Sequence, residues 1–126
     1  MEYIFRTIKS LTPYYTLDKL KNISTSKEIY KEMGEPILFN EKQVWIFAFY
    51  KKQLAGFICY ENDLINYIYT FPEFRNKGLF SILYNELPYQ NWKTISSNMS
   101  LNLFIKKGFK VVKNYKNCHK LEFKIK

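Results

Sequence analysis

Hydrophobic and polar residues alternate in several short stretches of the chain, and this alternation is the pattern of half-buried β-strands. The first stretch covers residues 3–8. Three more, at 44–50, 54–60 and 64–71, follow one another with only short polar turns between them. Short turns between consecutive strands are typical of an antiparallel meander. The middle of the chain is therefore predicted to form three neighbouring antiparallel strands.

Apolar residues spaced three and four apart indicate helices in other parts of the chain. The predicted helices are, in chain order, a short one through 17–23, a second at 27–33, and longer ones at 77–87 and 98–107. Pro88 ends the third helix, because proline cannot continue it. Gly108 is suited to a left-handed cap after the fourth helix. In that helix, Leu101, Phe104 and Ile105 are expected to face the core.

Three further strands are predicted at 92–96, 109–115 and 118–125. In the last of these, Leu121, Phe123 and Ile125 are expected to point inward. The element order is strand, helices, three strands, helix, strand, helix and two strands. This order predicts an α/β fold with a mixed sheet.

Length and composition narrow the class of protein. A chain of 126 residues, 47% of them hydrophobic, has room for one domain with one core. No apolar run approaches the ~20 residues of a membrane helix, so no membrane partner is expected. The N-terminal residues lack the pattern of a signal peptide, and the two cysteines are too few for a disulfide framework. A cytoplasmic location is therefore expected.

The positive charge is concentrated at the C-terminal end. The formal net charge is +9, and residues 88–126 hold nine Lys against Glu122 alone. Such a field attracts a phosphorylated cofactor, a nucleic acid or an acidic protein. The basic residues of the chain are almost all Lys, whereas Arg is the residue that proteins prefer for reading the bases of DNA. A solvated lysine-rich surface is the alternative interpretation.

Residues 69–80 hold the most informative pattern, because a predicted strand runs there through a short loop into a predicted helix. Phosphate binds well where backbone N–H groups are left unpaired at such a junction. Gly78 removes a side chain where an anion approaches the backbone, and Arg75 and Lys77 add charge. Ser81 offers a hydroxyl group. The loop is a candidate pyrophosphate cradle, and an ordinary strand–helix connection is the alternative.

Two stretches resemble motifs of the GCN5-related N-acetyltransferase (GNAT) superfamily. Residues 72–80 read Pro-Glu-Phe-Arg-Asn-Lys-Gly-Leu-Phe and resemble motif A, P-x-[YF]-R-x-K-G-x-[GA]. The following segment resembles motif B, N-x-x-[AS]-x-x-[LF]-[YF]-x-K-x-G-F. Its matching residues are Asn98, Leu101, Leu103, Phe104, Lys106, Lys107, Gly108 and Phe109. The predicted order of elements is also that of the family.

The resemblance implies a GNAT-like fold over residues 1–126, with a mixed, mostly antiparallel sheet of about seven strands and about four helices. It implies acetyl-CoA as co-substrate, bound where the central parallel strands 64–71 and 92–96 splay apart. A backbone N–H near residues 68–69 would polarise the thioester carbonyl. The residues expected to hold the cofactor are Tyr69, Thr70, Phe71, Arg75, Asn76, Lys77, Gly78, Leu79, Phe80, Ser81 and Asn98.

Two phenylalanines depart from the family pattern. Phe80 stands where most members have Gly or Ala, so its ring either narrows the cradle or turns into the core. Phe104 stands where many active members have a Tyr that protonates the leaving thiolate, and Phe cannot donate a proton. The alternative donors, by location, are Tyr67, Tyr69, Tyr84 and Tyr115.

The candidates for the general base are acidic residues near the central strand. Glu61 and Asp63 lie at the turn before it, near the position of a catalytic carboxylate in several family members, and Tyr69 is a further catalytic candidate. The alternatives are a water relay and a hairpin turn whose Asn62 and Asp63 serve turn geometry. His119 lacks evident metal-binding partners, and no metal is expected.

Three functions are compatible with this sequence. The first is an N-acetyltransferase in which a neutral primary amine, of a small molecule or a protein, attacks the acetyl carbonyl directly. The second is a catalytically inactive relative that binds CoA or a protein partner. The third is an acyltransferase directed at a DNA base or an aminoacyl-tRNA through the basic C-terminal third. The assembly is expected to be a monomer or a homodimer.

Overall fold

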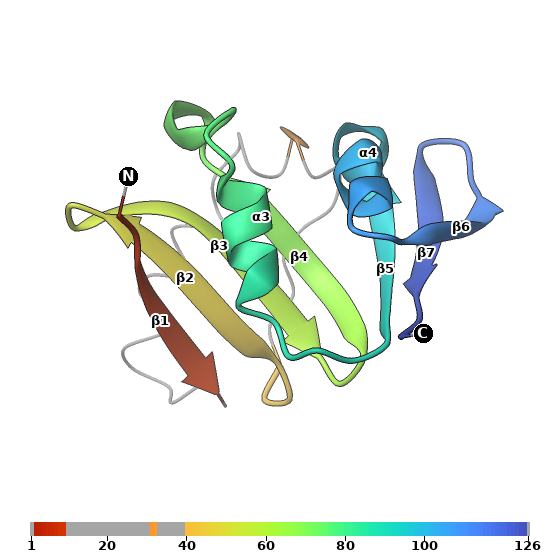
Figure 1. Ribbon diagram of the computed structural model, residues 1–126, viewed down its shortest axis with the longest axis horizontal. Coiled ribbons are helices and arrows are strands. Elements are labelled where there is room, and N and C mark those ends of the chain that lie inside the picture. Colours follow the sequence, from red (N-terminus) through yellow and green to blue (C-terminus); the bar gives the residue numbers. More distant parts are fainter. Residues whose placement is uncertain (1, 10–30, 33–39, 126) are drawn as a thin grey trace.

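The computed structural model in Figure 1 describes residues 2–9, 31–32 and 40–125, which form one twisted seven-stranded sheet with helices beside it. The strands are β1 (Ile4–Lys9), β2 (Val44–Tyr50), β3 (Gln53–Glu61), β4 (Leu64–Thr70), β5 (Trp92–Ser97), β6 (Lys110–Asn114) and β7 (Cys118–Phe123). Their order is β1-β2-β3-β4-β5-β7-β6. Every neighbouring pair is antiparallel except β4 and β5. The predicted mixed, mostly antiparallel sheet is confirmed.

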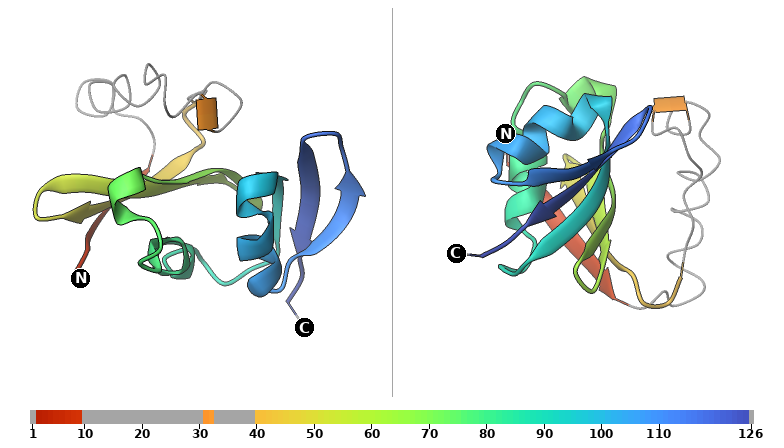
Figure 2. Two further views of the ribbon diagram at one scale, coloured as in Figure 1. Left: turned by 90° about the horizontal axis from the view of Figure 1, so that it is seen from above. Right: turned by 90° about the vertical axis from the view of Figure 1, so that its right-hand side faces the viewer.

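Two α-helices lie on one face of this sheet, α3 (Leu79–Asn85) and α4 (Asn98–Lys106), and a short 3-10 turn, η1 (Pro72–Phe74), follows β4. The expectation of about four helices is met only in part, since the described residues contain two. The helices predicted at 17–23 and 27–33 lie outside the described residues, except for 31–32, which are helical. Figure 2 shows that residues 31–32 lie on the opposite face of the sheet from α3.

The sheet opens between its two central parallel strands. β4 and β5 are in register only at Leu64↔Lys93 and Ile65↔Thr94. Directly afterwards, β4 contains an extra residue, Asn66, between the positions that pair with Tyr60 and Cys59 of β3. A bulge of this kind bends a strand and increases its twist. β4 therefore turns away from β5 and leaves a gap toward the carboxyl ends of both strands.

The same bulge changes which face of the sheet each β4 side chain occupies. In a regular strand, alternate residues share a face. Ile65 nevertheless packs in the cluster beneath α3 and α4, with Leu83 and Phe104. Tyr67 and Tyr69 pack on the opposite face in a second cluster. The remaining members of that cluster are Trp45, Phe47, Phe57 and Cys59.

Two residues predicted to face the core are exposed instead. Ile105 is 45% exposed, because α4 buries a narrow stripe through Phe104 and the next residue is rotated away from the sheet. Ile125 is 40% exposed, because β7 ends at Phe123 and Ile125 lies beyond the last strand pair. Among the helices that the structure describes, none has the length and apolar character needed to cross a membrane.

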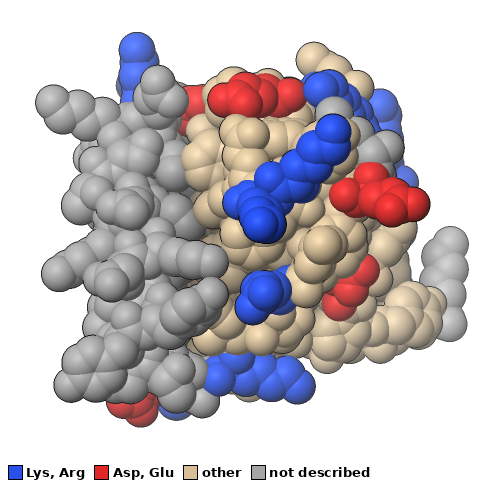
Figure 3. All heavy atoms as spheres, turned by 90° about the vertical axis from the view of Figure 1, so that its left-hand side faces the viewer, with Lys and Arg blue, Asp and Glu red and all other residues tan. Residues whose placement is uncertain are grey.

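Charge is distributed differently at the two edges of the sheet. At the β1 edge, shown in Figure 3, acidic and basic side chains are interspersed. At the other edge, all five residues of β6 are exposed, including Lys110 and Lys113. The positive charge of the C-terminal third therefore lies partly on an exposed edge strand.

Candidate functional site

A cavity of about 410 Å³ occupies the gap between β4 and β5. Its described lining comprises Glu32, residues 65–70 of β4, the loop residues 74–76 and 78–81, Thr94, Ile95 and Ser97 of β5, and Met99, Ser100, Leu103 and Phe104 of α4. The cavity thus connects both faces of the sheet with the loop that precedes α3. Eight of the predicted cofactor residues line it, namely Tyr69, Thr70, Arg75, Asn76, Gly78, Leu79, Phe80 and Ser81.

The loop before α3 has the backbone of an open cradle. Asn76 (φ 61°) and Gly78 (φ 77°) both adopt the left-handed conformation, and Gly78 caps α3 without a side-chain hydrogen bond. A Cβ atom placed on Gly78 would meet no atom of the described residues within 4 Å. The space in front of this glycine is therefore open, and the loop backbone is accessible to an anion. The left-handed glycine also explains why α3 begins at Leu79, two residues later than predicted.

Arg75 does not project freely from this loop. Its Nε donates a hydrogen bond to the carbonyl oxygen of Thr70 at 3.0 Å, and its Nη2 forms an ion pair with Glu32. The guanidinium group lies over the ring of Tyr69, 5.5 Å from the centroid, and the Tyr69 hydroxyl donates to Glu32 at 3.1 Å. The predicted phosphate-flanking cation is thus partly neutralised. Lys77 is exposed and lies outside the cavity lining.

Glu32 is the functional candidate that the sequence analysis missed. Among the described residues that line the cavity, it is the single carboxylate. It lies 43 positions before Arg75 in the chain and belongs to no motif, so no sequence signal connected it to the site. Only the folded chain brings it to Tyr69 and Arg75.

The predicted bases lie elsewhere. Glu61 accepts a hydrogen bond from Nδ2 of Asn40 at 2.9 Å, and Asp63 forms a 3.8 Å ion pair with Lys93. Both lie near the start of β4, whereas the open end of the cavity is at its carboxyl end, and neither is in the described lining. Asn62 between them has a φ of 54°. This geometry fits the alternative in which these residues form a hairpin turn.

Asn98 also lies outside the cavity. It is exposed, and its Oδ1 is 2.7 Å from Nε2 of His119. The cavity wall is formed instead by its neighbours Ser97 and Ser100. Counting motif B backwards from Gly108 gives the same answer, because the asparagine position then falls on Ser97 and the small-residue position on Ser100.

The two unusual phenylalanines contact each other. Phe80 turns toward α4, and its ring meets the ring of Phe104 edge to face, with centroids 5.1 Å apart. Phe104 is 1% exposed and also packs against Phe109. Of the two alternatives for Phe80, the structure therefore has the ring turned inward, where it forms part of the cavity wall.

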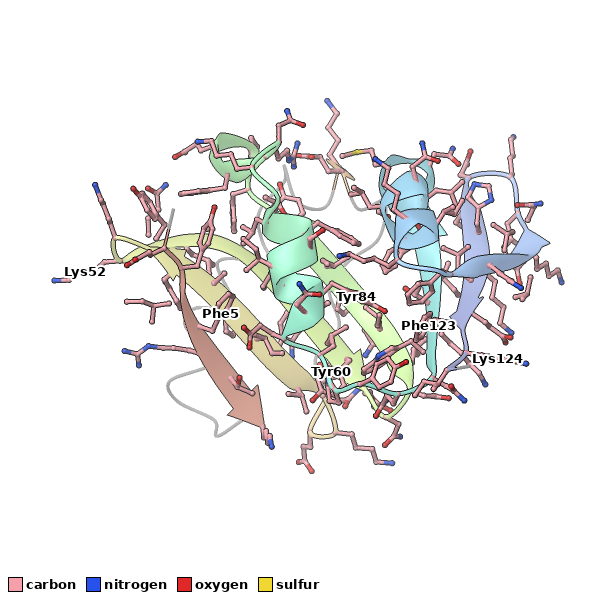
Figure 4. The ribbon with its side chains drawn as sticks, viewed as in Figure 1. Phe5, Lys52, Tyr60, Tyr84, Phe123 and Lys124 are labelled. Carbon is pink, nitrogen blue, oxygen red and sulfur yellow. The ribbon has the colours of Figure 1, made fainter. Side chains whose placement is uncertain are left out.

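The alternative tyrosine donors separate into two groups. Tyr67 and Tyr69 line the cavity. Tyr84 packs against Phe109 and, with Phe123, lines a second hollow beside the C-terminal half of α3; both side chains are labelled in Figure 4. Tyr115 follows β6 and is 45% exposed. Phe71, a predicted cofactor residue, packs edge to face on Tyr69 outside the described lining.

The surroundings of Cys59 and His119 account for these two side chains without a catalytic role. Cys59 is buried, and this burial raises the pKa of its thiol well above the ordinary value. His119 lies between the side-chain oxygens of Asn98 and Asn114. Within the described ranges, no group of three His, Cys, Asp or Glu side chains is arranged to hold a metal ion.

Comparison with known proteins identifies the fold. No family model and no curated protein matches the chain. Among solved structures, it is similar to PaiA N-acetyltransferase from Thermoplasma acidophilum in complex with coenzyme A, at 15% identity and a TM-score of 0.67 over 99% of this chain and all of that one. It is also similar to an acyl-CoA N-acyltransferase from Pseudomonas aeruginosa, at 13% identity and a TM-score of 0.68 over 96% and 99% of the two chains.

A third similar structure is a GNAT-family acetyltransferase from Elizabethkingia anophelis with acetyl-CoA bound, at 15% identity and a TM-score of 0.63 over 98% of each chain. Sequence identities this low carry information about the fold alone. The chain has the fold of GNAT-family acetyltransferases along nearly its whole length.

Proposed function

We propose that this chain is an acyl-CoA-dependent N-acyltransferase of the GNAT superfamily, which moves an acetyl group from acetyl-CoA to a primary amine. The observation that supports this most strongly is the cavity between β4 and β5. It joins an open, glycine-containing loop to a slot in the sheet. Coenzyme A has the complementary chemistry, with a pyrophosphate at one end and a narrow amide-bearing arm at the other.

In this proposal the backbone N–H groups of residues 76–81 bind the pyrophosphate, since Gly78 leaves the space before them open. The N–H of Arg75 donates instead to the carbonyl oxygen of Pro72. The pantetheine arm enters the gap beside β4. The register between β4 and β5 ends at Ile65 and Thr94, and the arm lies in the gap beyond this pair, where its amides hydrogen-bond to the backbone of β4. A β4 N–H near residues 68–69 then donates to the thioester carbonyl and stabilises the negative charge that develops there.

The acceptor amine approaches from the face of the sheet that carries Glu32 and Tyr69, opposite α3 (Figure 2). The neutral amine attacks the acetyl carbon, and the C–S bond breaks as the amide forms. The amine must lose one proton, and Glu32 is the cavity carboxylate that can accept it, directly or through a water molecule. Its ion pair with Arg75 fixes the position of the carboxylate.

Calorimetric titration with acetyl-CoA, followed by a thiol-release assay on a panel of primary amines, tests the proposal. We expect saturable binding with one site, and CoA release that depends on at least one amine. Absence of acetyl-CoA binding would remove the proposal.

A catalytically inactive, CoA-binding relative is the second candidate. The contact between Phe80 and Phe104 favours it, because two apolar rings occupy the cavity wall where an acid would be useful. This candidate predicts acetyl-CoA binding with no turnover on any amine of the panel.

A further inference from the structure

Three serine side chains form a hydrogen-bonded cluster where β5 ends and α4 begins. The Oγ atoms of Ser96 and Ser100 are 2.7 Å apart, and those of Ser97 and Ser100 are 3.5 Å apart. Ser96 is 2% exposed, whereas Ser97 and Ser100 line the cavity. The cluster therefore reaches from the buried side of the sheet to the cavity wall.

Counting hydrogens shows which hydroxyl can serve a ligand. A serine hydroxyl has one hydrogen to donate. Ser96 donates its hydrogen to the carbonyl oxygen of Ser97 at 2.8 Å, so the hydrogen in the short Ser96–Ser100 contact comes from Ser100. The Ser97 hydrogen is left with the 3.5 Å contact to Ser100, which is at the limit of a hydrogen bond. Ser97 is also the residue before the first turn of α4, and its side chain does not cap the helix.

The Ser97 hydroxyl lies near the place where a tyrosine at position 104 would put its hydroxyl, which Phe104 lacks. Residues 97, 100 and 104 recur at helical spacing and all line the cavity. Long side chains on a helix lean back over the preceding turn. A phenol at position 104 would therefore bring its hydroxyl over the turn that starts at Ser97 and Ser100. The serine cluster places a hydroxyl there by a different route.

We propose that Ser97 donates a hydrogen bond to the sulfur of coenzyme A as the C–S bond breaks, with Ser100 and Ser96 as positioning residues. This inference rests on the proposed acyl transfer. When the bond breaks, its electron pair goes to sulfur and the acetyl group stays on the acceptor nitrogen. A serine hydroxyl is a much weaker acid than a thiol, so Ser97 keeps its proton and stabilises the thiolate by hydrogen bonding. The thiolate takes a proton from solvent after release.

Such a donor favours the thiolate over the thiol, and this preference can be measured without knowing the acceptor. The affinity of CoA is compared with that of desulfo-CoA, which lacks the sulfur, by calorimetry from pH 7 to pH 9.5. If bound CoA has a lower thiol pKa than free CoA, the ratio of the two affinities rises with pH until free CoA is itself ionised. We expect a rise of about tenfold, which corresponds to about one pKa unit.

Ser97→Ala is expected to flatten this rise. Its affinity for desulfo-CoA serves as the reference from which the ratio is taken, and thermal unfolding shows that the variant is folded. Ser100→Ala is expected to reduce the rise, because Ser97 then loses its partner. Asn98→Ala is the matched control, since it removes a polar group at the next position but outside the cavity, and it should keep the full rise.

The outcomes separate this inference from the proposed function. A flat ratio in the wild-type protein, or an undiminished rise in Ser97→Ala, overturns the role of Ser97 while CoA binding still stands. A rise that is lost in Asn98→Ala overturns it as well, because the effect would not belong to the cavity hydroxyls. If neither CoA nor desulfo-CoA binds, the proposed function itself fails.

Discussion

Substituting Gly78 by glutamate tests the cradle directly, because the structure predicts separate effects on stability and on binding. In the part of the chain that the structure describes, no atom lies within 4 Å of the new Cβ, so no clash is expected. The backbone has a φ of 77°, and holding a residue other than glycine in this conformation costs about 1–2 kcal/mol. For a chain of 126 residues, this corresponds to a fall in Tm of about 4–8 °C.

The loss of binding comes from the charge. A carboxylate about 4 Å from one phosphate charge costs about 1 kcal/mol in bulk water and about 4 kcal/mol near a protein surface. Two such charges in the pyrophosphate weaken acetyl-CoA binding by at least about 30-fold. Calorimetric titration measures this loss, and thermal unfolding confirms that the variant is folded.

Two alanine variants isolate the two effects. Gly78→Ala has the same backbone cost without the charge, and it should bind acetyl-CoA much more tightly than Gly78→Glu. Gly108→Ala also places a side chain at a positive φ, here 96°, but outside the described cavity lining, so it should lose stability alone. If Gly78→Glu binds acetyl-CoA as well as Gly78→Ala does, the pyrophosphate lies elsewhere and the assignment of the loop is refuted.

Five further measurements test other parts of the interpretation. Phe104→Ala should lower the free energy of unfolding in urea by about 3–5 kcal/mol, because a ring that is 1% exposed leaves a cavity; an unchanged midpoint would contradict its burial. Glu32→Gln should slow amine acetylation by about 100-fold with little change in acetyl-CoA affinity, and a normal rate would show that water alone takes the proton. In the native protein a disulfide reagent should modify the partly exposed Cys118 and spare the buried Cys59. Burial raises the pKa of the Cys59 thiol above 9.0, so this thiol ionises first in unfolded chains, and the stability that it contributes should fall as the pH rises above about 9, as urea unfolding at several pH values measures. Finally, if the lysines of residues 88–126 bind nucleic acid, a tRNA or DNA gel shift should weaken at least about tenfold between 50 and 200 mM salt, and a shift that is absent or insensitive to salt removes that function.

The sequence predicted the elements well wherever local pattern decides structure. The strand at 44–50 has the bounds of β2, and the strand at 92–96 differs from β5 by one residue. Gly108 has the expected left-handed conformation. These features depend on alternation, turn residues and caps, which are written in neighbouring positions of the chain.

The site was predicted less completely, because it depends on contacts between distant segments and on a change of strand register. The loop at Gly78 could be found from its own residues. The bulge at Asn66 could not, since Leu64–Thr70 reads as a regular strand, and yet this bulge separates β4 from β5 and moves Tyr69 to the other face. Glu32 reaches the cavity through tertiary contacts alone. Glu61 was a candidate because it is near the central strand in sequence, but it lies at the turn between β3 and β4, away from the open end of the cavity.

The two register pairs between β4 and β5 have a mechanical consequence. They join two leaves of the sheet at one end of the gap, one leaf of strands β1 to β4 and one of strands β5, β7 and β6, and the core beneath α3 and α4 packs against both. A molecule that fills the gap would hydrogen-bond to both leaves and act as a clamp between them. Because such a clamp is present in the native state and absent from the unfolded chain, its concentration should set the melting temperature of the whole molecule.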